Sequence, residues 1–294
     1  MIGLGRLLGL VGLGGERYDV NGRVVLITGA GQGIGRELAA ILHRRGARIA
    51  VVDIDAAAAE TAARDLGSRA LGVGADVADR EGMEAAIAWA IDHFGRLDVV
   101  VANAGVVPEA ATLRTMTGPA FDRVMAINLT GVYNTVHPAL DQIVANRGHV
   151  VVVSSCAAFA PGMAGSPYMI SKAAVEQLGR ALRVELAGFG ASAGVSYFGV
   201  VETEMTRSTL DRDPLGHELD SLLPWPLNVR ISATEAATVI ADGIARRAPR
   251  TVAPLGWEPY ALLRGAVNVV LDSRLANDAR MHDLVRRVEQ RARP

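Results

Sequence analysis

The sequence predicts an α/β protein in which a doubly wound parallel sheet lies between two layers of helices. Three observations favour this three-layer α/β/α fold. Short, nearly continuous apolar runs alternate with helix-like segments, and 50% of the 294 residues are hydrophobic although only 4% are aromatic. Buried parallel strands under closely packed helices require such an aliphatic composition. No repeat or low-complexity linker divides the chain, so we expect a single domain with apolar extensions at both ends.

The predicted elements follow one another in a regular order. Apolar runs of strand length lie at 24–28, 48–53, 70–74, 99–103, 150–155 and 194–198, with a shorter one at 251–253. Helix-like segments lie between them, at 34–45, 56–66, 80–94, 118–146 and 169–187. Strands that are apolar on both faces are typical of a parallel sheet, whose crossover connections are right-handed.

Some regions fall outside this alternation. Residues 206–230 combine charged residues with an apolar, proline-containing run, which predicts a substrate-binding loop. The chain then divides into an apolar leader (1–20), a main domain (21–253) and a C-terminal extension (254–294) that ends in a charged helix. The apolar start is too short for a transmembrane helix and lacks a signal-peptide cleavage pattern. It is either a flexible or packed leader, or a peripheral contact with a membrane or a neighbouring subunit.

Charge and cysteine content exclude several classes of protein. The net charge is −1 and no basic run is present, which excludes a nucleic-acid partner. A single cysteine, Cys156, excludes an intramolecular disulfide and fits a reducing compartment, so we expect a cytoplasmic protein. The six histidines are scattered without zinc spacing, so no metal site is expected.

A glycine-rich turn follows the first predicted strand and opens the first predicted helix. It reads Thr28-Gly-Ala-Gly-Gln-Gly-Ile-Gly35. Glycines allow the backbone to approach a phosphate closely, and the helix N-terminus supplies free N–H groups and a favourable dipole. In this strand–turn–helix context the sequence predicts a dinucleotide site that includes Gly29, Gln32, Gly33, Ile34 and Gly35.

Asp53 ends the second predicted strand, eighteen residues after Gly35. A carboxylate there can accept hydrogen bonds from both ribose hydroxyls of an adenosine and would repel a 2′-phosphate. No arginine or lysine follows it directly, so we predict NAD rather than NADP as the cofactor. Asp53 is alternatively the N-cap of the next helix, a role that Asp55 fills equally well. Asp76 and Val77 fit either an adenine contact or an ordinary turn after the third strand.

Lys172 is the only lysine of the chain, against twenty-nine arginines, and it follows Tyr168 by four residues at the start of a predicted helix. Residues spaced by four lie on one face of a helix. A compact ammonium beside a phenol favours the phenolate and lowers its pKa from about 10. The pair therefore predicts a tyrosine that transfers a proton near neutral pH. The alternative is a surface lysine one turn away from a packed tyrosine.

Together these motifs resemble those of the short-chain dehydrogenases/reductases, a family with a Rossmann fold, over about residues 21–253. The motifs occur in the family's order and are the turn 28–35, Asp76-Val77, Asn103-Ala104-Gly105, Asn128, Ser155, and Tyr168 with Lys172. Ser155 precedes Tyr168 by thirteen residues, the family's usual separation. Two positions depart from the pattern. Ala102 replaces an asparagine, and Phe198 replaces the proline that usually stiffens the backbone beside the nicotinamide.

The resemblance implies a role for each of these residues. Tyr168 would be the general acid/base, and Ser155 would orient the same substrate oxygen. Lys172 would lower the Tyr168 pKa and bind the nicotinamide ribose, while Asn128 would hold a water in a proton relay to solvent. The further cofactor contacts that the resemblance implies are Asn103, Ala104, Gly105, Val201 and Thr203.

Residue types near this site predict an apolar substrate pocket. Substrate contacts are expected from Ala157, Met205, Leu222 and Trp225. With little charge among them, they suit a hydrophobic secondary alcohol or ketone. Ser154 should point to the opposite face of its strand, and Cys156 should be a packed side chain rather than a nucleophile.

The sequence thus predicts an NAD-dependent oxidoreductase that interconverts a hydrophobic secondary alcohol and its ketone. The alternative is a catalytically silent NAD-binding module with a regulatory or membrane-associated role. The resemblance also implies a homo-oligomer, tetrameric or dimeric, formed through the helices predicted at 118–146 and 169–187. Small residues such as Ala173 and Ala181 would permit close packing there.

Overall fold

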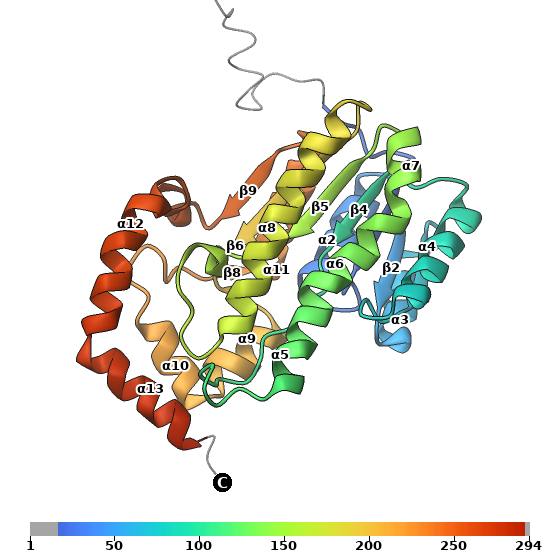
Figure 1. The fold of residues 1–294 in the computed structure, drawn as a ribbon. Coiled ribbons are helices and arrows are strands. Elements are labelled where there is room, and N and C mark those ends of the chain that lie inside the picture. The colour runs from blue at the N-terminus through green and yellow to red at the C-terminus, as the bar shows by residue number, and fades with distance from the viewer. Residues whose placement is uncertain (1–16, 292–294) are drawn as a thin grey trace, which may run out of the picture.

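A parallel sheet of seven strands forms the centre of the computed structural model, which describes residues 17–291 (Figure 1). Along the sheet the strand order is β3-β2-β1-β4-β5-β6-β9. The strands are β1 (Val24–Thr28), β2 (Arg48–Asp53), β3 (Ala70–Gly74), β4 (Val99–Ala102), β5 (His149–Val153), β6 (Ser192–Phe198) and β9 (Arg250–Ala253). The chain starts in the middle of the sheet and winds outward to both edges, so the predicted doubly wound fold is confirmed.

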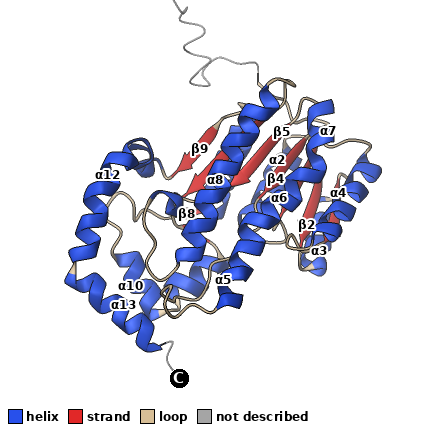
Figure 2. Cartoon of the chain, viewed as in Figure 1, coloured by secondary structure: helices blue, strands red, loops and turns tan. Residues whose placement is uncertain are grey.

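Helices cover both faces of the sheet (Figure 2). Alternate residues of each strand face opposite layers of helices, which gives the sheet two separate cores. Val24 and Leu26 belong to one core, and Val25 and Ile27 belong to the other. The first layer contains α4 (Arg80–Phe94), α5 (Gly118–Met125), α6 (Gly131–Val136), α7 (Leu140–Ala145) and α8 (Ser166–Ala187). The second layer contains α2 (Gly33–Arg44), α3 (Ala56–Leu66) and α11 (Ala233–Ala245).

The single helix predicted over 118–146 is interrupted twice, so that prediction is wrong in its continuity. A π-helical turn at Ala126–Thr130 separates α5 from α6, and a 3-10 turn at His137–Ala139 separates α6 from α7. Pro138 accounts for the second break, because proline has no N–H for the helical hydrogen bond. The π-helical turn contains Asn128, a fully buried side chain that is hydrogen-bonded to the backbone of Val106.

The edge of the sheet opposite the carboxyl ends of the strands is held by one buried carboxylate. Asp98 is fully buried and accepts hydrogen bonds from Arg96 at 2.6 and 2.7 Å, from Arg23 at 2.8 Å and from the backbone N–H of Val24 at 3.0 Å. Burial alone would raise the pKa of Asp98, but these hydrogen bonds, led by that from Arg96, hold the pKa below its ordinary value. The carboxylate therefore fastens the start of β1 to the segment that enters β4.

Residues 206–230, predicted as a loop, contain helical turns. A three-residue helix, α9 (Glu204–Thr206), leads into a π-helical turn (Arg207–Asp211) and then into α10 (Pro214–Ser221). The base of this region is closed by a short parallel pair in which β7 (Val201–Glu202) bonds to β8 (Ile231–Ser232). We call residues 206–230 the substrate lobe.

The C-terminal extension forms two helices beyond the β9 edge of the sheet. After a 3-10 turn (Leu255–Trp257), α12 (Glu258–Asn277) and α13 (Ala279–Arg291) run down one side of the molecule and reach α10 (Figure 1, red). No helix among residues 17–291 is long and apolar enough to cross a membrane.

Most of the predicted apolar leader, residues 1–16, lies outside the described residues. Within the rest of it, Tyr18 and Val20 are buried in the second core. The Tyr18 backbone N–H donates a 2.8 Å hydrogen bond to the carbonyl of Ala245, at the end of α11. The described end of the leader therefore packs against the main domain.

Candidate functional site

A cleft of about 360 Å³ opens at the carboxyl ends of the strands. The strands β4 and β5 end at Ala102 and Val153, earlier than predicted, so Asn103 and Ser155 lie in the segments just beyond them. The predicted site residues that line the cleft are Gly29, Gln32, Gly33, Ile34, Asp53, Asp76, Val77, Asn103, Ala104, Gly105, Ser155, Tyr168, Lys172, Val201, Thr203 and Met205. Ligands bind at this edge of open α/β sheets because strand order reverses there.

The glycine turn leaves room at the N-terminus of α2. Gly29 and Gly33 have φ values of +61° and +56°, which disfavour any other residue. A Cβ on Gly35 would lie 2.4 Å from the carbonyl oxygen of Gly29. The N-cap residue, Gln32, makes no side-chain capping hydrogen bond, and the first turn of α2 has no acidic residue. The free N–H groups of α2 therefore fit an anionic group such as a pyrophosphate.

Asn103 fastens this turn to the end of β4. Its side-chain amide donates to the carbonyls of Thr28 at 2.9 Å and Gly29 at 3.2 Å. The Thr28 hydroxyl accepts hydrogen bonds from the backbone N–H groups of Asn103 at 3.1 Å and Ala104 at 3.2 Å. Sequence reasoning missed the role of Thr28. The sequence signal for this role was a hydroxyl side chain, Thr28, at the end of an otherwise apolar strand.

The Asp53 carboxylate lies at the adenosine end expected for the cleft. One of its oxygens accepts from the Gly31 N–H at 2.9 Å, and the other accepts from the Asp55 N–H at 3.1 Å. Asp55 caps α3 through the Ala58 N–H at 3.0 Å, so the capping role belongs to Asp55. Asp53 is thus held beside the glycine turn by two backbone donors.

Ser155, Tyr168 and Lys172 meet where β5 and β6 end. The Lys172 ammonium donates to the Val153 carbonyl at 2.9 Å and lies 5.7 Å from the centre of the Tyr168 ring. The Ser155 hydroxyl donates to the Phe198 carbonyl at 3.2 Å. Ser155 and Lys172 are 7% and 4% exposed, so the three groups face a largely dry end of the cleft.

Asn128 lies behind this group rather than in the cleft lining. Its side-chain oxygen accepts from the Val106 N–H at 2.8 Å, and its amide donates to the Val106 carbonyl at 2.9 Å and to the Ser171 hydroxyl at 3.1 Å. A Cβ on Gly105 would lie 3.3 Å from both the Asn128 oxygen and the Lys172 nitrogen. Asn128 therefore links the segment after β4 to α8, and a side chain at position 105 would be crowded where the Asn128 and Lys172 side chains converge. Ser171 is a further residue that sequence reasoning missed.

The expected lowering of the Tyr168 pKa is not found. Burial raises the pKa of Tyr168, although a hydrogen bond with Ser155 opposes the shift. Burial also lowers the pKa of Lys172 to about 8. The reason is desolvation, which penalises the charged form of both groups and which the four-residue spacing cannot reveal.

The neighbours of Ser155 have structural partners. The Ser154 hydroxyl donates to the backbone carbonyl of Lys172 at 2.7 Å, so it holds α8 against β5. Cys156 is fully buried, and burial raises its thiol pKa.

The four predicted substrate residues fall in different places. Met205 lines the cleft, whereas Ala157, Leu222 and Trp225 are not in its lining, and Trp225 is 80% exposed. The same cleft wall also contains Thr206, which begins the predicted substrate-binding loop, and Gly199, together with Val106 and Phe198, which were not predicted as substrate contacts. Thr203 also lines the cleft, where its hydroxyl caps α9 by accepting from the Thr206 N–H at 3.3 Å. All of these residues lie at or shortly after the carboxyl end of a strand, and that position was the signal in the sequence that could have identified them.

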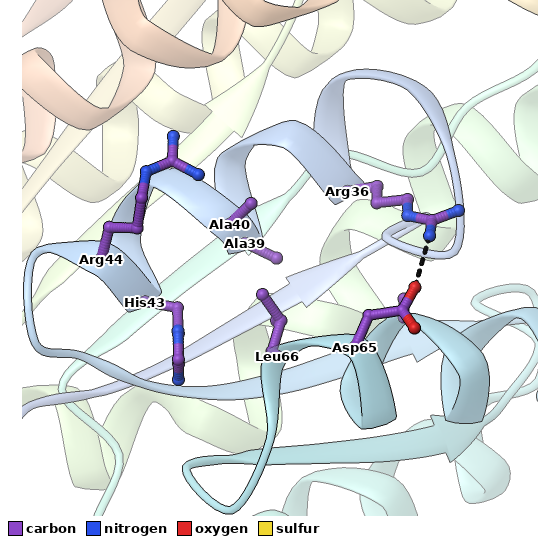
Figure 3. Close-up of a pocket in the computed structure, with 8 residues that line it drawn as sticks. Arg36, Ala39, Ala40, His43, Arg44, Asp65 and Leu66 are labelled. Atoms are coloured by element: carbon purple, nitrogen blue, oxygen red, sulfur yellow. Dashed lines mark hydrogen bonds and ion pairs between the residues drawn. The ribbon is translucent and has the colours of Figure 1, made fainter.

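A second hollow, of about 420 Å³, lies between α2 and α3 (Figure 3). It is lined by Arg36, His43 and Arg44 of α2 and by Asp65 of α3, together with alanine and leucine side chains. Arg36 and Asp65 pair across it at 2.7 Å. None of the predicted site residues lines this hollow, and it lacks a buried polar group, so the smaller cleft is the candidate site.

Comparisons with known proteins point to one family. The sequence profile described as short chain dehydrogenase matches residues 23–214. The chain is 36% identical over 212 residues to 2-(R)-hydroxypropyl-CoM dehydrogenase of Xanthobacter autotrophicus, which covers 69% of this chain and 84% of that protein. It is 34% identical over 270 residues to the probable oxidoreductase EphD of Mycobacterium tuberculosis, which covers 88% of this chain but only 45% of that relative. The 3-ketoacyl-(acyl-carrier-protein) reductase of Brucella melitensis, solved in complex with NADH, has a TM-score of 0.69 and 26% identity, over 80% of this chain and 97% of that one.

Replacing Lys172 with methionine should stabilise the fold at neutral pH. The pKa of Lys172 is about 8 in the folded protein, below its unfolded value, so the buried charge costs most below pH 8, and the cost disappears above the unfolded pKa. We expect Lys172→Met to raise the free energy of unfolding by up to about 3 kcal/mol at pH 7, and by progressively less as the pH rises to about 10. Denaturant unfolding at both pH values measures this.

The matched control is Arg180→Met on the same helix, where the side chain is 62% exposed and no such gain is expected. A loss of stability on replacing Lys172 at pH 7, or an equal gain at pH 10, would contradict the assigned cost of burial.

Proposed function

This chain belongs to the short-chain dehydrogenase family, and on that premise we propose that it is an NAD-dependent oxidoreductase that interconverts a hydrophobic secondary alcohol and its ketone. Members of the family are oxidoreductases that bind a nicotinamide cofactor. The observation that carries the proposal is the meeting of Ser155, Tyr168 and Lys172 in a cleft whose other end has free helical N–H groups.

The residues of the cleft divide the chemistry among them. A bound nicotinamide cofactor supplies the hydride acceptor or donor. Tyr168 exchanges a proton with the substrate oxygen, and Ser155 donates a hydrogen bond to the same oxygen as its charge changes. Because Lys172 titrates near pH 8, it can both carry a positive charge toward the cofactor ribose and pass a proton. Asn128 acts as a positioning residue for Val106 and α8 in this scheme, and its relay role stays a prediction.

The preference for NAD rests on the charge around Asp53. Its carboxylate is held by two backbone donors beside the glycine turn, where a 2′-phosphate would meet a negative charge. The cations in the cleft lining that the structure describes are Arg123 and Lys172, and the lysine is at the catalytic end. The Brucella structure in complex with NADH is consistent with this preference.

The proposed substrate class follows from the catalytic end of the cleft. Val106, Phe198 and Met205 line the same cleft as Tyr168, and the Phe198 carbonyl accepts the hydrogen bond of Ser155, so these apolar side chains favour an apolar substituent on the carbinol carbon. The Xanthobacter relative is named for a hydroxypropyl substrate, which also carries a secondary alcohol.

The experiment that tests this function is NADH formation at 340 nm with a panel of secondary alcohols that ranges from apolar to polar. We expect turnover with apolar alcohols and NAD, and at least tenfold lower kcat/KM with NADP, because the repulsion at Asp53 should cost more than about 1.4 kcal/mol. Preference for NADP would contradict the account of Asp53. Tight NAD binding without turnover of any alcohol would favour the catalytically silent alternative.

Removing the phenol hydroxyl should abolish the reaction and leave the fold intact. We expect Tyr168→Phe to lower kcat by roughly 10²- to 10⁴-fold, because a positioned acid/base contributes about that factor, with the Kd for NAD nearly unchanged. Steady-state kinetics and isothermal titration measure the two quantities. Tyr133→Phe is the matched control, since Tyr133 is 41% exposed on α6 and does not line the cleft. Near-normal turnover by Tyr168→Phe would remove the proposed proton-transfer role.

We propose in addition that α12 makes the peripheral membrane contact that the apolar ends of the chain predict. Two polar residues near its middle turn inward: Arg264 pairs with Glu176, and Asn268 donates to the Phe159 carbonyl at 2.8 Å. Leu262, Leu263, Val269 and Val270 point outward and are 59–72% exposed. A helix with apolar residues on its solvent face requires an apolar partner.

Charges on this face should weaken that contact. We expect Leu263→Glu/Val270→Glu to lower co-sedimentation with phospholipid vesicles about tenfold or more, since burying each side chain contributes roughly 1.5–3 kcal/mol. Val184→Glu is the control, because Val184 is 76% exposed on α8. Equal sedimentation of all variants would exclude a lipid contact at α12. Sedimentation of the unaltered protein without vesicles reports the homo-oligomer predicted through α8.

A further inference from the structure

Helices α12 and α13, which we call the C-terminal clamp, contact both the substrate lobe and the segment 106–117, two segments that begin at or next to residues of the cleft lining. We propose that this clamp determines which substrates the cleft accepts, by fastening the substrate lobe to the segment 106–117 on the opposite side. The inference rests on the proposed function, because it concerns the alcohol site of the same cleft. It assigns positioning roles to Arg287, Glu289 and Arg291.

The helix α13 is a packed element and not a trailing tail. Met281, Leu284 and Val288 are 4%, 2% and 0% exposed, and their spacing of three and four places them on one face. The charged residues of α13 therefore flank its buried face, where they contact the neighbouring segments.

One margin of α13 pairs with the substrate lobe. Arg287 pairs with Glu218 at 2.5 Å, and Arg291 pairs with both carboxylate oxygens of Asp213, at 2.7 and 2.9 Å. Asp213 is also the N-cap of α10 and accepts from the Leu215 N–H at 3.1 Å. The clamp thus holds α10 at its first residue and near its middle.

The other contacts of α13 reach the segment 106–117. The Glu289 carboxylate accepts from the Thr112 hydroxyl at 2.9 Å and pairs with Arg114. Arg291 donates to the Ala110 carbonyl at 3.2 Å, so one guanidinium touches Ala110 and Asp213 together. The two sides of the cleft mouth are therefore joined through α13.

Both joined segments continue directly from residues of the cleft. The substrate lobe follows Thr203 and Met205, and the segment 106–117 begins at Val106, which lines the cleft wall. The Ala111 N–H donates to the Ala164 carbonyl at 3.0 Å, which ties this segment to the stretch that leads into Tyr168. A displacement of either segment would therefore change the space beside the proton-transfer group.

The clamp has a fixed base on the body of the protein. Arg264 of α12 pairs with Glu176 of α8 at 2.5 and 2.7 Å. The Tyr260 hydroxyl and the Asn268 amide both donate to the Phe159 carbonyl, at 3.1 and 2.8 Å. Phe159 ends the turn that follows Ser155, so the clamp is anchored beside the catalytic end and can hold the mouth against it.

The test reverses the two charges of α13 that hold the substrate lobe. Each ion pair is partly exposed and contributes little stability alone, but both pairs hold the same substrate lobe against α13. For Arg287→Glu/Arg291→Glu we expect a roughly 5- to 30-fold higher KM for the preferred alcohol, a kcat within about threefold and an unchanged Kd for NAD. The kcat/KM of the double variant for bulkier alcohols should fall less than that for the preferred alcohol, so the selectivity between the two should decrease. Arg286→Glu is the matched control, since Arg286 pairs within α13 with Asp283 at 3.8 Å.

Two further measurements separate the clamp from a general loss of structure and from failure of the proposed function. Hydrogen exchange should quicken in 206–221 and 106–117 of the double variant and stay unchanged in Arg286→Glu, and this readout needs no turnover. Adding Glu218→Arg to Arg287→Glu should lower the KM part of the way back to that of the unaltered protein, because the ion pair is re-formed with its charges reversed. Unchanged exchange and unchanged KM in the double variant would overturn the clamp. Absence of turnover in the unaltered protein would overturn the proposed function alone, while the exchange experiment would still decide the clamp.

Discussion

The parallel register between β1 and β4 is the constraint on which the site depends. Leu26 pairs with Val100 and Ile27 with Val101, so both strands end at the same level. Thr28 and Asn103 then meet across that end and exchange hydrogen bonds that fix the glycine turn. Because β5 and β6 continue the same register, Ser155 and the segment after Phe198 arrive at the same edge. A shift of one residue would invert the buried faces of a strand and would also separate these groups.

The catalytic end of the cleft is electrostatically unfavourable to the fold. Lys172 is almost fully buried and its ammonium donates to the Val153 carbonyl, so among the described residues its charge is held by a backbone dipole and not by a neighbouring carboxylate. Other buried polar groups around it have hydrogen-bond partners: the Ser154 hydroxyl donates to the Lys172 carbonyl, and the Asn128 amide bonds to both backbone polar groups of Val106. Burial of these groups lowers the stability of the fold, and it makes the pKa values of Lys172 and Tyr168 sensitive to any group that binds beside them.

The two helices of the C-terminal extension distribute their polar and apolar residues in opposite ways. In α12 the polar side chains of Arg264 and Asn268 are used to fasten the helix to the body, which leaves leucine and valine side chains outside. In α13 the apolar residues are buried, and the charged residues pair with α10 and with the segment 106–117. One extension thus combines an anchored base, an outward apolar face and a bridge over the substrate end.

The sequence by itself determined the features that depend on local spacing. These are the alternation that builds the sheet, the glycine turn before α2, and the helical separation that brings Tyr168 and Lys172 to one cleft. It did not reveal the π-helical turn at Asn128, the raised pKa of Tyr168 or the exposure of Trp225. Nor did it pair Arg287 with Glu218, 69 residues away, or Arg291 with Ala110, 181 residues away. Desolvation and contacts between distant segments exist only once the chain is folded, and for that reason the tertiary structure alone decided the electrostatics of the site and the pairing of α13 with α10 and the segment 106–117.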